Sequence, residues 1–272
     1  MIDTLFNLKR NHTFYIVNKM NKSIEDILAE TSFKNSEIEN ISIDTMGNFL
    51  NNLEMKILDY YQYDNFYSAL SSGFEPEALG CTMAPFYFAV QNWSDHLSNF
   101  HNKLLLEYDS KLIEHIKENI MDEAGYENGQ IYQDKRHTLT FVNFLHALDF
   151  KNKIILTKPV INFNNSLQDI LDNCSPGFNA CVLGGIEFFY IKISSLLLTY
   201  CSERNIEQEH YATHEIIDKK HAMDFFTVAQ NCNATSNDIF FGVIRGCVLI
   251  HNLLDELYKE YCDNQKIEQF VL

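Results

Sequence analysis

Apolar residues recur at helical spacing along most of this 272-residue chain. Between Ile43 and Tyr61 they keep to one stripe, which predicts a long amphipathic helix. The proline in Glu75-Pro76-Glu77 opens a second helix, and its aromatic run up to Trp93 predicts burial on nearly all sides. The same spacing predicts further helices over 93–108, 110–122, 133–148, 179–201, 205–229 and 236–262.

Two segments depart from this pattern. Residues 1–40 are polar and predict an extension with one short helix from Ile24 to Glu30. The segment 151–165 is β-branched and interrupted by Pro159, which favours an extended connection or a short edge strand. Because the sequence shows no internal repeat or linker, we predict an all-α protein in which residues 41–272 form a single helical, metal-binding domain.

Composition and charge narrow the classes of partner. The chain is 46% hydrophobic and has only 10 Gly and 4 Pro, too few turn residues for a many-stranded sandwich or barrel. Asp and Glu number 37 against 21 Lys and Arg, so the net charge of -16 repels phosphate backbones and anionic lipid surfaces. We therefore expect neither nucleic acid nor a membrane as a partner.

The seven cysteines indicate the compartment. They are scattered and include no CxxC pair, which predicts reduced core thiols rather than disulfides. The start of the chain lacks the apolar run of a signal peptide, and we expect no window to reach the roughly 20 apolar residues that span a membrane. These features predict a cytoplasmic protein, although an exported bacterial effector without a cleaved signal would share them.

A candidate metal-binding triplet lies in the stretch EHYATHEIIDKKHAMDFF. His214, Asp218 and His221 stand at i, i+4 and i+7, so two imidazoles and a carboxylate share one helix face. This ligand set suits non-haem iron with open positions for O2, and facing helices can complete a two-metal site. The alternative is a solvated helix face beside charges such as Lys219 and Lys220.

Isolated acids upstream favour the metal hypothesis. Glu187 stands alone in the apolar stretch VLGGIEFFYIKI, where an unpartnered carboxylate would be costly and a metal cation would stabilise it. Further upstream, Asp122 and Glu123 end one predicted helix and His137 lies in the next. Taken alone, such a terminal acid pair is more often a solvated helix end.

In this order the residues resemble the heme-oxygenase-like diiron oxidases and oxygenases. The family's N-x-x-[DE]-E-x-G motif matches residues 119–125, and its His-x3-Asp-x2-His helix matches residues 214–221. The resemblance covers about residues 70–255 and implies a heme-oxygenase-like bundle of about seven core helices that holds two irons.

The resemblance also implies how the ligands divide between the two irons. One site would share Glu123, His137 and Glu187, with Glu187 as a bridge, and the other would use His214, Asp218 and His221. The spacing from Glu123 to His137 is long for the family, so Glu127 or His146 could substitute.

The implied activity is O2-dependent oxidation of a small organic substrate, such as an amino acid or a carboxylic acid, by C–C cleavage, N-oxygenation or a similar reaction. The implied cofactors are two iron ions, with manganese as an alternative, together with O2 and an external electron source. Tyr190 and Tyr211 are candidate hydrogen-bonding groups or electron donors, and Arg245 is a candidate partner for a substrate carboxylate. Both tyrosines could instead be ordinary core residues, and Arg245 could pair with a structural acid.

Two other classes of function stay open. A helical interaction protein, including a host-directed bacterial factor, would fit the polar extension and the acidic charge. A metal-independent relative, resembling thiaminase II or the oxidase that forms pyrroloquinoline quinone, would not require the His-x3-Asp-x2-His triplet. The complete set of three acids and three histidines favours the diiron enzyme, and both a homodimer and a host protein partner are compatible with the sequence.

Overall fold

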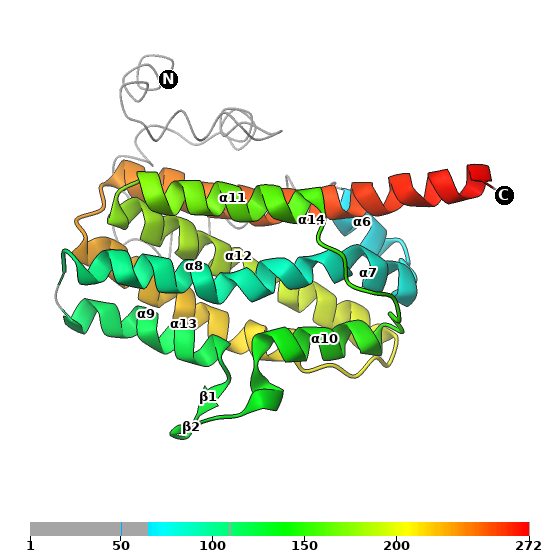
Figure 1. Cartoon of the computed structure of the whole chain (residues 1–272), viewed down its shortest axis with the longest axis horizontal. Coiled ribbons are helices and arrows are strands. Elements are labelled where there is room, and N and C mark those ends of the chain that lie inside the picture. The colour runs from blue at the N-terminus through cyan, green and yellow to red at the C-terminus, as the bar shows by residue number, and fades with distance from the viewer. Residues whose placement is uncertain (1–49, 51–64, 109, 272) are drawn as a thin grey trace, which may run out of the picture.

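The computed structural model describes residue 50, residues 65–108 and residues 110–271, and most of them are helical (Figure 1). The predicted all-α fold class is therefore confirmed. The predicted extension over 1–40 and all of the predicted helix over 43–61 except Leu50 lie outside the described residues. In chain order the elements are α6 (Asn65–Ser71), α7 (Pro76–Met83), η2 (Ala84–Phe86), α8 (Tyr87–Leu105), α9 (Ser110–Glu123), β1 (Tyr126–Glu127), β2 (Gln130–Ile131), η3 (Gln133–Lys135), α10 (His137–Ala147), α11 (Lys158–Asn173), α12 (Pro176–Glu203), α13 (His210–Asn231) and α14 (Ser236–Val271).

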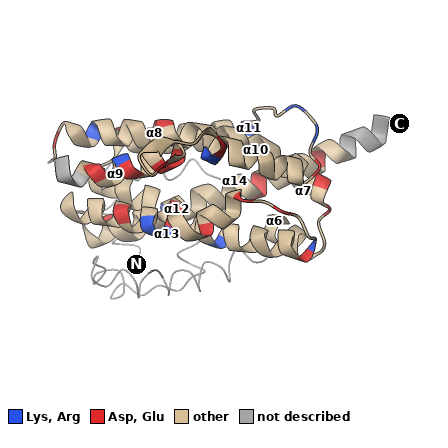
Figure 2. Ribbon diagram, turned by 90° about the horizontal axis from the view of Figure 1, so that it is seen from below, with Lys and Arg blue, Asp and Glu red and all other residues tan. Residues whose placement is uncertain are grey.

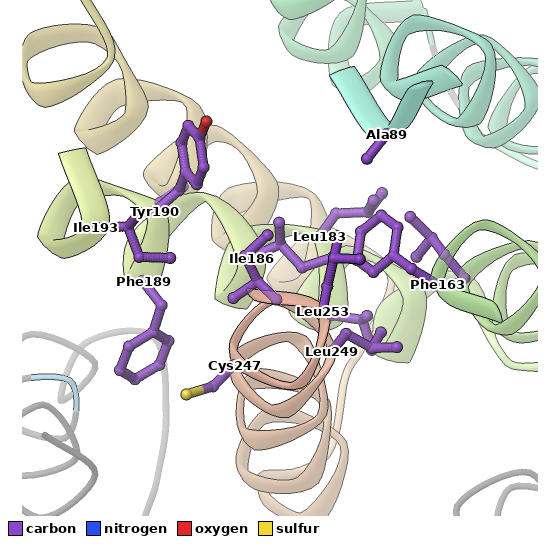
Figure 3. Packing of buried hydrophobic residues seen from close by; sticks show 14 of the residues in the cluster. Ala89, Phe163, Leu183, Ile186, Phe189, Tyr190, Ile193, Cys247, Leu249 and Leu253 are labelled. Atoms are coloured by element: carbon purple, nitrogen blue, oxygen red, sulfur yellow. The ribbon is translucent and has the colours of Figure 1, made fainter. Parts of the chain in front are cut away.

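α12 is the central helix of the bundle. It makes its most extensive contacts with α13 and α14, and it also touches α8 and α11. Figure 1 shows these helices running along the long axis of the molecule, with α9 and α10 beside α13. In Figure 3, Ile186 and Phe189 of α12 lie close to Cys247 of α14 inside the hydrophobic core. Because α12 is apolar on nearly every side, burial at the centre is the arrangement that its sequence favours.

Two glycines allow α12 and α14 to approach each other closely. A Cβ on Gly246 would lie 2.2 Å from the carbonyl oxygen of Val182, and a Cβ on Gly185 would lie 2.5 Å from that of Val243. Neither contact leaves room for a methyl group. Since Gly185 lies just before Glu187, this crossing also determines the depth at which Glu187 lies in the bundle.

The predicted boundary between the second and third helices is wrong. Pro85 interrupts the chain within η2, so one helix ends at Met83 and the next begins at Tyr87. Proline has no amide proton to donate, and its ring crowds the preceding turn. Trp93 consequently lies inside α8 rather than at a helix start.

The prediction of an extended segment or edge strand over 151–165 is wrong beyond Thr157. The residues up to Thr157 have no regular structure, but α11 follows, with Pro159 in its first turn. Proline is tolerated there because the first amide groups of a helix have no intrahelical acceptor. Val160 and Phe163 then face the core at helical spacing, so tertiary packing outweighs the β propensity of this stretch.

The expectation that no segment matches a membrane span is also wrong. Pro176–Glu203 and Ser236–Gln265 are each long and apolar enough by length and composition alone. In an apolar 18-residue window of each helix, 67% and 78% of the residues, respectively, are buried inside the protein. Mostly buried core helices of a soluble protein have the same composition, so these two helices are weak evidence for a membrane.

The cysteines follow the expectation of reduced thiols. The structure describes all seven cysteines and shows no disulfide between them, and Cys174, Cys181, Cys201 and Cys247 are buried. Burial raises the pKa of the Cys247 thiol well above its usual range, which makes it an inert core thiol. Figure 2 shows Asp and Glu spread over several helices, with Lys and Arg between them.

Candidate metal centre

Glu123 and His137 meet where a small hairpin folds the chain back on itself. α9 ends at Glu123, and Gly125 follows with a φ of +75°, a left-handed conformation that favours glycine. β1 and β2 form a hairpin through Asn128-Gly129 and return the chain to α10, which begins at His137. His137 Nδ1 thereby lies 2.7 Å from Glu123 Oε2, despite their long spacing in the sequence.

Glu187 lies in the middle of α12 and is only 4% exposed. Its Oε1 accepts a hydrogen bond of 3.2 Å from the indole Nε1 of Trp93 on α8. One hydrogen bond fixes the orientation of the carboxylate but leaves most of its lone pairs available. Glu187 is therefore a buried, oriented carboxylate that can still bind a cation.

α13 carries the predicted triplet on one buried face. His214, Asp218 and His221 are all buried, so the alternative of a solvated helix face is wrong. His214 Nδ1 and Asp218 Oδ1 are 2.8 Å apart. The charged neighbours Lys219 and Lys220 are exposed on the opposite side of the helix.

Side chains from α9, α12 and α13 converge and form one cluster. Glu123, Glu187 and His221 each offer one ligand atom, and these atoms all lie within 4.8 Å of one another. The rings of His137 and His214 are adjacent, with centroids 4.5 Å apart. These contacts group His221 with the two glutamates and His214 with His137, whereas the expected division placed His214 and His221 at the same ion.

Burial holds several of these groups away from their usual charge state. Burial raises the pKa of Glu187 well above its ordinary value, and the nearby Asp218 carboxylate raises it further. Burial also raises the pKa of Asp218. Burial lowers the pKa of His214 well below its ordinary value, and His137 adds to that effect. A bound cation would remove the repulsion between these carboxylates.

For Glu123, His137 and His221, attraction between paired charges shifts the pKa in the direction opposite to the effect of burial. Burial alone would raise the pKa of Glu123 and lower that of His137, but their mutual attraction outweighs it, so the pKa of Glu123 is lowered and that of His137 is raised. Burial also opposes protonation of His221, but its hydrogen bond to Asp122 and the charge of Glu187 raise the pKa of this imidazole to about 9.

Buried polar atoms without partners show that the donor set fits metal ions. Among the described residues, Asp218 Oδ2, His221 Nδ1 and both side-chain polar atoms of Asn119 have no hydrogen-bond partner. His137 Nδ1 lies near Glu123 without hydrogen-bond geometry, as two ligands of one ion would. Unsatisfied buried groups are costly, and an imidazole and carboxylate set suits first-row transition metals. The donor set around Glu123, Glu187 and His221 therefore fits a metal ion.

Asp122 orients His221 from outside the cluster. His221 Nε2 and Asp122 Oδ2 form a hydrogen bond of 3.1 Å. Once His221 is neutral and donates through Nε2, its lone pair lies on Nδ1, which is 3.9 Å from Glu187 Oε1. Carboxylates commonly hold ligand histidines in this way. The adjacency of Asp122 to Glu123 was the only sequence signal for this role.

Replacing Asp122 with asparagine should weaken metal binding without destroying the cluster. An amide at this position can present its nitrogen to Nε2 and favour the wrong tautomer, so the affinity should fall roughly 10- to 100-fold. Titration with Co²⁺, followed by its visible absorption, measures the change. Asp134→Asn is the control, because Asp134 lies in the exposed η3 turn. Equal affinities in both variants and the parent would contradict this role of Asp122.

A further buried histidine lies beside these residues and was not predicted from the sequence. The ring of His210, at the start of α13, lies 4.5 Å from that of His214. The Thr140 hydroxyl donates to the carbonyl oxygen of His137 at 3.1 Å, so His210 Nδ1 must donate to Thr140 Oγ1 at 2.9 Å. His210 Nε2 then carries a lone pair and has no partner among the described residues. The spacing His210-x3-His214 could have identified it.

The alternative ligands lie elsewhere. Glu127 is exposed in β1 and forms an ion pair with Lys135. His146 is exposed near the end of α10. Neither side chain reaches the cluster, because the hairpin projects from the bundle (Figure 1) and His146 faces outward. The structure thus brings Glu123 and His137, rather than these two residues, to the centre.

The other candidate residues divide into two groups. Tyr190 and Tyr211 are buried beside the histidines, and the ring of Tyr190 lies 5.0 Å from that of His214. Burial raises the pKa of Tyr190 well above its ordinary value, so this hydroxyl keeps its proton. Arg245 is buried in α14, where burial lowers its pKa to about 10, and it does not line the pocket next to the cluster.

That pocket has a volume of about 50 Å³ and reaches three of the candidate ligands. Its walls are almost entirely apolar. The lining residues are Phe86, Ala89, Val90, Trp93, Glu123, Phe163, Ile186, Glu187, Tyr190, His214 and Ile250.

Comparison with known proteins does not assign this chain to a family. No protein-family model matches the sequence, and no curated protein matches it at a significant level.

Proposed function

We propose that this protein is a non-haem diiron oxidase or oxygenase built on a heme-oxygenase-like helical bundle. One observation carries the proposal. Ligand atoms of Glu123, Glu187 and His221 lie within 4.8 Å of one another, and all three side chains are buried. His137, His214 and Asp218 surround them, which completes a set of three carboxylates and three imidazoles. The substrate is a small organic molecule.

Each side chain has a defined task in this proposal. Glu123, Glu187 and His221 hold metal directly, and His137 and His214 provide further nitrogen ligands. Asp218 either ligates through Oδ2 or orients His214. Two ferrous ions, or one iron and one manganese, would supply electrons for the reduction of O2 and open positions for O2 or substrate. A full catalytic cycle then also requires an external electron donor or electrons from the substrate.

The surrounding residues keep the centre dry and oriented. Trp93 holds Glu187 through its indole N–H, and Asp122 holds His221. Phe86 and Tyr190 stack with ring centroids 6.0 Å apart at the wall of the pocket. Apolar walls exclude water, which strengthens electrostatic interactions inside the site and protects reactive species from side reactions.

Metal affinity should rise with pH until about pH 9. The pKa of His221 is raised to about 9, so in the metal-free protein this imidazole is protonated at neutral pH and must lose its proton to bind metal. Each proton released adds about one log unit of affinity per pH unit. Co²⁺ titrations between pH 6 and 10 test this, and a flat profile would contradict it. Asp122→Asn should move the upper end of the slope to lower pH.

Anaerobic titration of the metal-free protein with ferrous iron tests the function itself. We expect two equivalents to bind, and we expect O2 consumption on subsequent exposure to air. Glu187→Ala and His214→Ala should lose binding and O2 consumption. His146→Ala, which removes an exposed histidine, is the matched control and should behave like the parent.

The outcomes separate the classes of function. Two bound irons with O2 consumption support the diiron enzyme and justify a screen of amino acids, carboxylic acids and neutral alkyl compounds. If the parent protein binds no iron, the proposal fails, and a protein partner or a metal-independent activity becomes the next hypothesis to examine.

A further inference from the structure

The apolar pocket beside the candidate metal centre reaches the candidate ligands themselves. Glu123, Glu187 and His214 line it, so a molecule in the pocket lies next to the groups that would hold metal. Figure 3 shows two of its other wall residues, Ala89 on α8 and Phe163 on α11. The pocket therefore adjoins the place where O2 would be reduced.

The size of the pocket limits what it can hold. Its volume of about 50 Å³ is about a third of the roughly 150 Å³ of an engineered apolar cavity that binds benzene or xenon. The pocket consequently has room for a diatomic molecule or a single xenon atom but not for a six-membered ring.

The chemistry of the wall favours an uncharged, apolar occupant. No Lys or Arg is found among the described residues that line the pocket, and the indole N–H of Trp93 already donates to Glu187. A substrate carboxylate would lose its hydration there without meeting a counter-charge in the wall. O2 carries no charge and needs no hydrogen bond, so transfer from water into an apolar cavity is favourable for it.

We propose that this pocket is the O2-binding site of the enzyme, an inference that rests on the proposed function above. O2 is held by dispersion contacts with apolar side chains such as Ala89, Ile186 and Ile250, and it lies beside Glu187 and His214. Charged groups of the organic substrate stay outside the pocket, because its wall offers them no partner.

The paramagnetism of O2 provides a direct test. O2 accelerates the relaxation of methyl protons near the place where it binds, so we would label the isoleucine methyl groups of the full-length, metal-free protein and compare their relaxation under N2 and under O2. Ile186 and Ile250 line the pocket, whereas Ile170 and Ile239 are also buried but do not line it. The enhancement should be at least about 3-fold larger at the first pair than at the second.

Two further probes test the size and the apolar character of the site. Xenon, which is not paramagnetic, should shift the methyl resonances of Ile186 and Ile250 in a saturable way. Cyclohexanol carries a six-membered ring, so it should not reduce the effect of O2 on these two residues.

Variants of Ala89 assign the effect to the pocket. Ala89→Val and Ala89→Leu fill it in two steps, so the O2 enhancement at Ile186 should decrease from the parent to valine and again to leucine. The smaller change decides the test if the leucine variant does not fold. Ala147→Leu, at an exposed position in α10, is the matched control and should behave like the parent.

The same variants have a kinetic consequence in the iron-loaded protein. Ala89→Val should raise the KM for O2 by about 3-fold or more and leave kcat within about 2-fold, as expected when binding alone is weakened. An oxygen electrode measures both constants at a fixed concentration of a reductant such as ascorbate.

The outcomes distinguish the O2 site from the proposed enzyme. Equal enhancement at all four isoleucines, or an unchanged enhancement in both Ala89 variants, would overturn the O2 site even if two irons bind. Loss of the O2 effect with cyclohexanol would also overturn it, because the pocket would then hold the ring of an organic molecule. A selective effect at Ile186 and Ile250 in a protein that binds no iron would overturn the proposed enzyme instead.

Discussion

Replacing Glu187 with glutamine should abolish tight metal binding and, at the same time, stabilise the metal-free protein. The amide keeps the shape of the side chain but removes the charge that attracts a cation. We expect metal affinity to fall by more than the roughly 100-fold that changes outside the ligand set cause. In the absence of metal the ionised carboxylate destabilises the folded protein, because burial and the nearby Asp218 raise its pKa well above the ordinary value.

The sign of the stability change depends on pH. The unfolded chain ionises Glu187 at its ordinary pKa of about 4.3, whereas the folded protein resists ionisation up to a much higher pH. The folded state therefore loses stability relative to the unfolded state as the pH rises above that ordinary value. At pH 7 glutamine should therefore stabilise the metal-free protein, and the gain should vanish near pH 4.

Urea unfolding with and without Fe²⁺ or Co²⁺ measures both effects. Metal at 100 times its dissociation constant should stabilise the parent by about 2.7 kcal/mol but should leave Glu187→Gln unchanged. Glu127→Gln, on the exposed hairpin, is the matched control and should keep the parent's response. A Glu187→Gln variant that is less stable without metal, or that still gains stability from metal, would contradict this account.

Replacing Gly246 with alanine should disrupt the bundle at its centre. The added Cβ would lie 2.2 Å from the carbonyl oxygen of Val182 and 2.7 Å from the backbone nitrogen of Ile186. Both atoms belong to the backbone of α12, so no side-chain rotation can relieve the contact. Overpacking ordinarily costs about 1–3 kcal/mol, and a collision between two helix backbones should exceed that range.

The consequence should reach the metal centre as well as the fold. Gly246 packs against the turn of α12 that precedes Glu187, so separation of the two helices also displaces this carboxylate. We expect a loss of several kcal/mol in the free energy of unfolding, together with weaker metal binding in the protein that folds.

Gly80→Ala is the comparison for this effect. Its Cβ would meet Phe150 Cβ at 3.1 Å and Leu148 Cβ at 3.3 Å, so these neighbours need to move by only a few tenths of an ångström. Chemical denaturation of both variants gives the two costs. Similar losses in Gly246→Ala and Gly80→Ala would show that the contact between α12 and α14 is less rigid than described.

Local sequence was a good guide where one physical signal dominates. The apolar periodicity of α12, α13 and α14 predicts each helix, because burial of an apolar face is what stabilises a helix in a folded protein. The i, i+4, i+7 spacing places His214, Asp218 and His221 on one face, since helix geometry alone determines this. The prediction from sequence was wrong within 151–165. There the β-branched composition favoured an extended segment, whereas α11 begins at Lys158 with Pro159 in its first turn.

The contacts around the metal centre show a second limit of prediction from sequence. Nothing local relates Trp93 to Glu187, or Asp122 to His221, because these contacts join helices that are distant along the chain. Asn128-Gly129 is the usual two-residue hairpin signal, and its recognition would have explained how Glu123 reaches His137. The hairpin turn is encoded by neighbouring residues, but the contact between Glu123 and His137 that it allows joins two different helices.

By itself the sequence determined that this protein is helical, that its cysteines form no disulfide framework, and that six residues with metal-binding side chains occur in a particular order. Those properties follow from periodicity, composition and side-chain chemistry, which act within a few residues. Only the tertiary structure decided which of these groups touch: His221 lies with Glu123 and Glu187, and His214 lies beside His137. The physical reason is that helix packing sets the distances between elements, and here it depends on backbone contacts at glycines such as Gly246, which leave no periodic signal in the sequence.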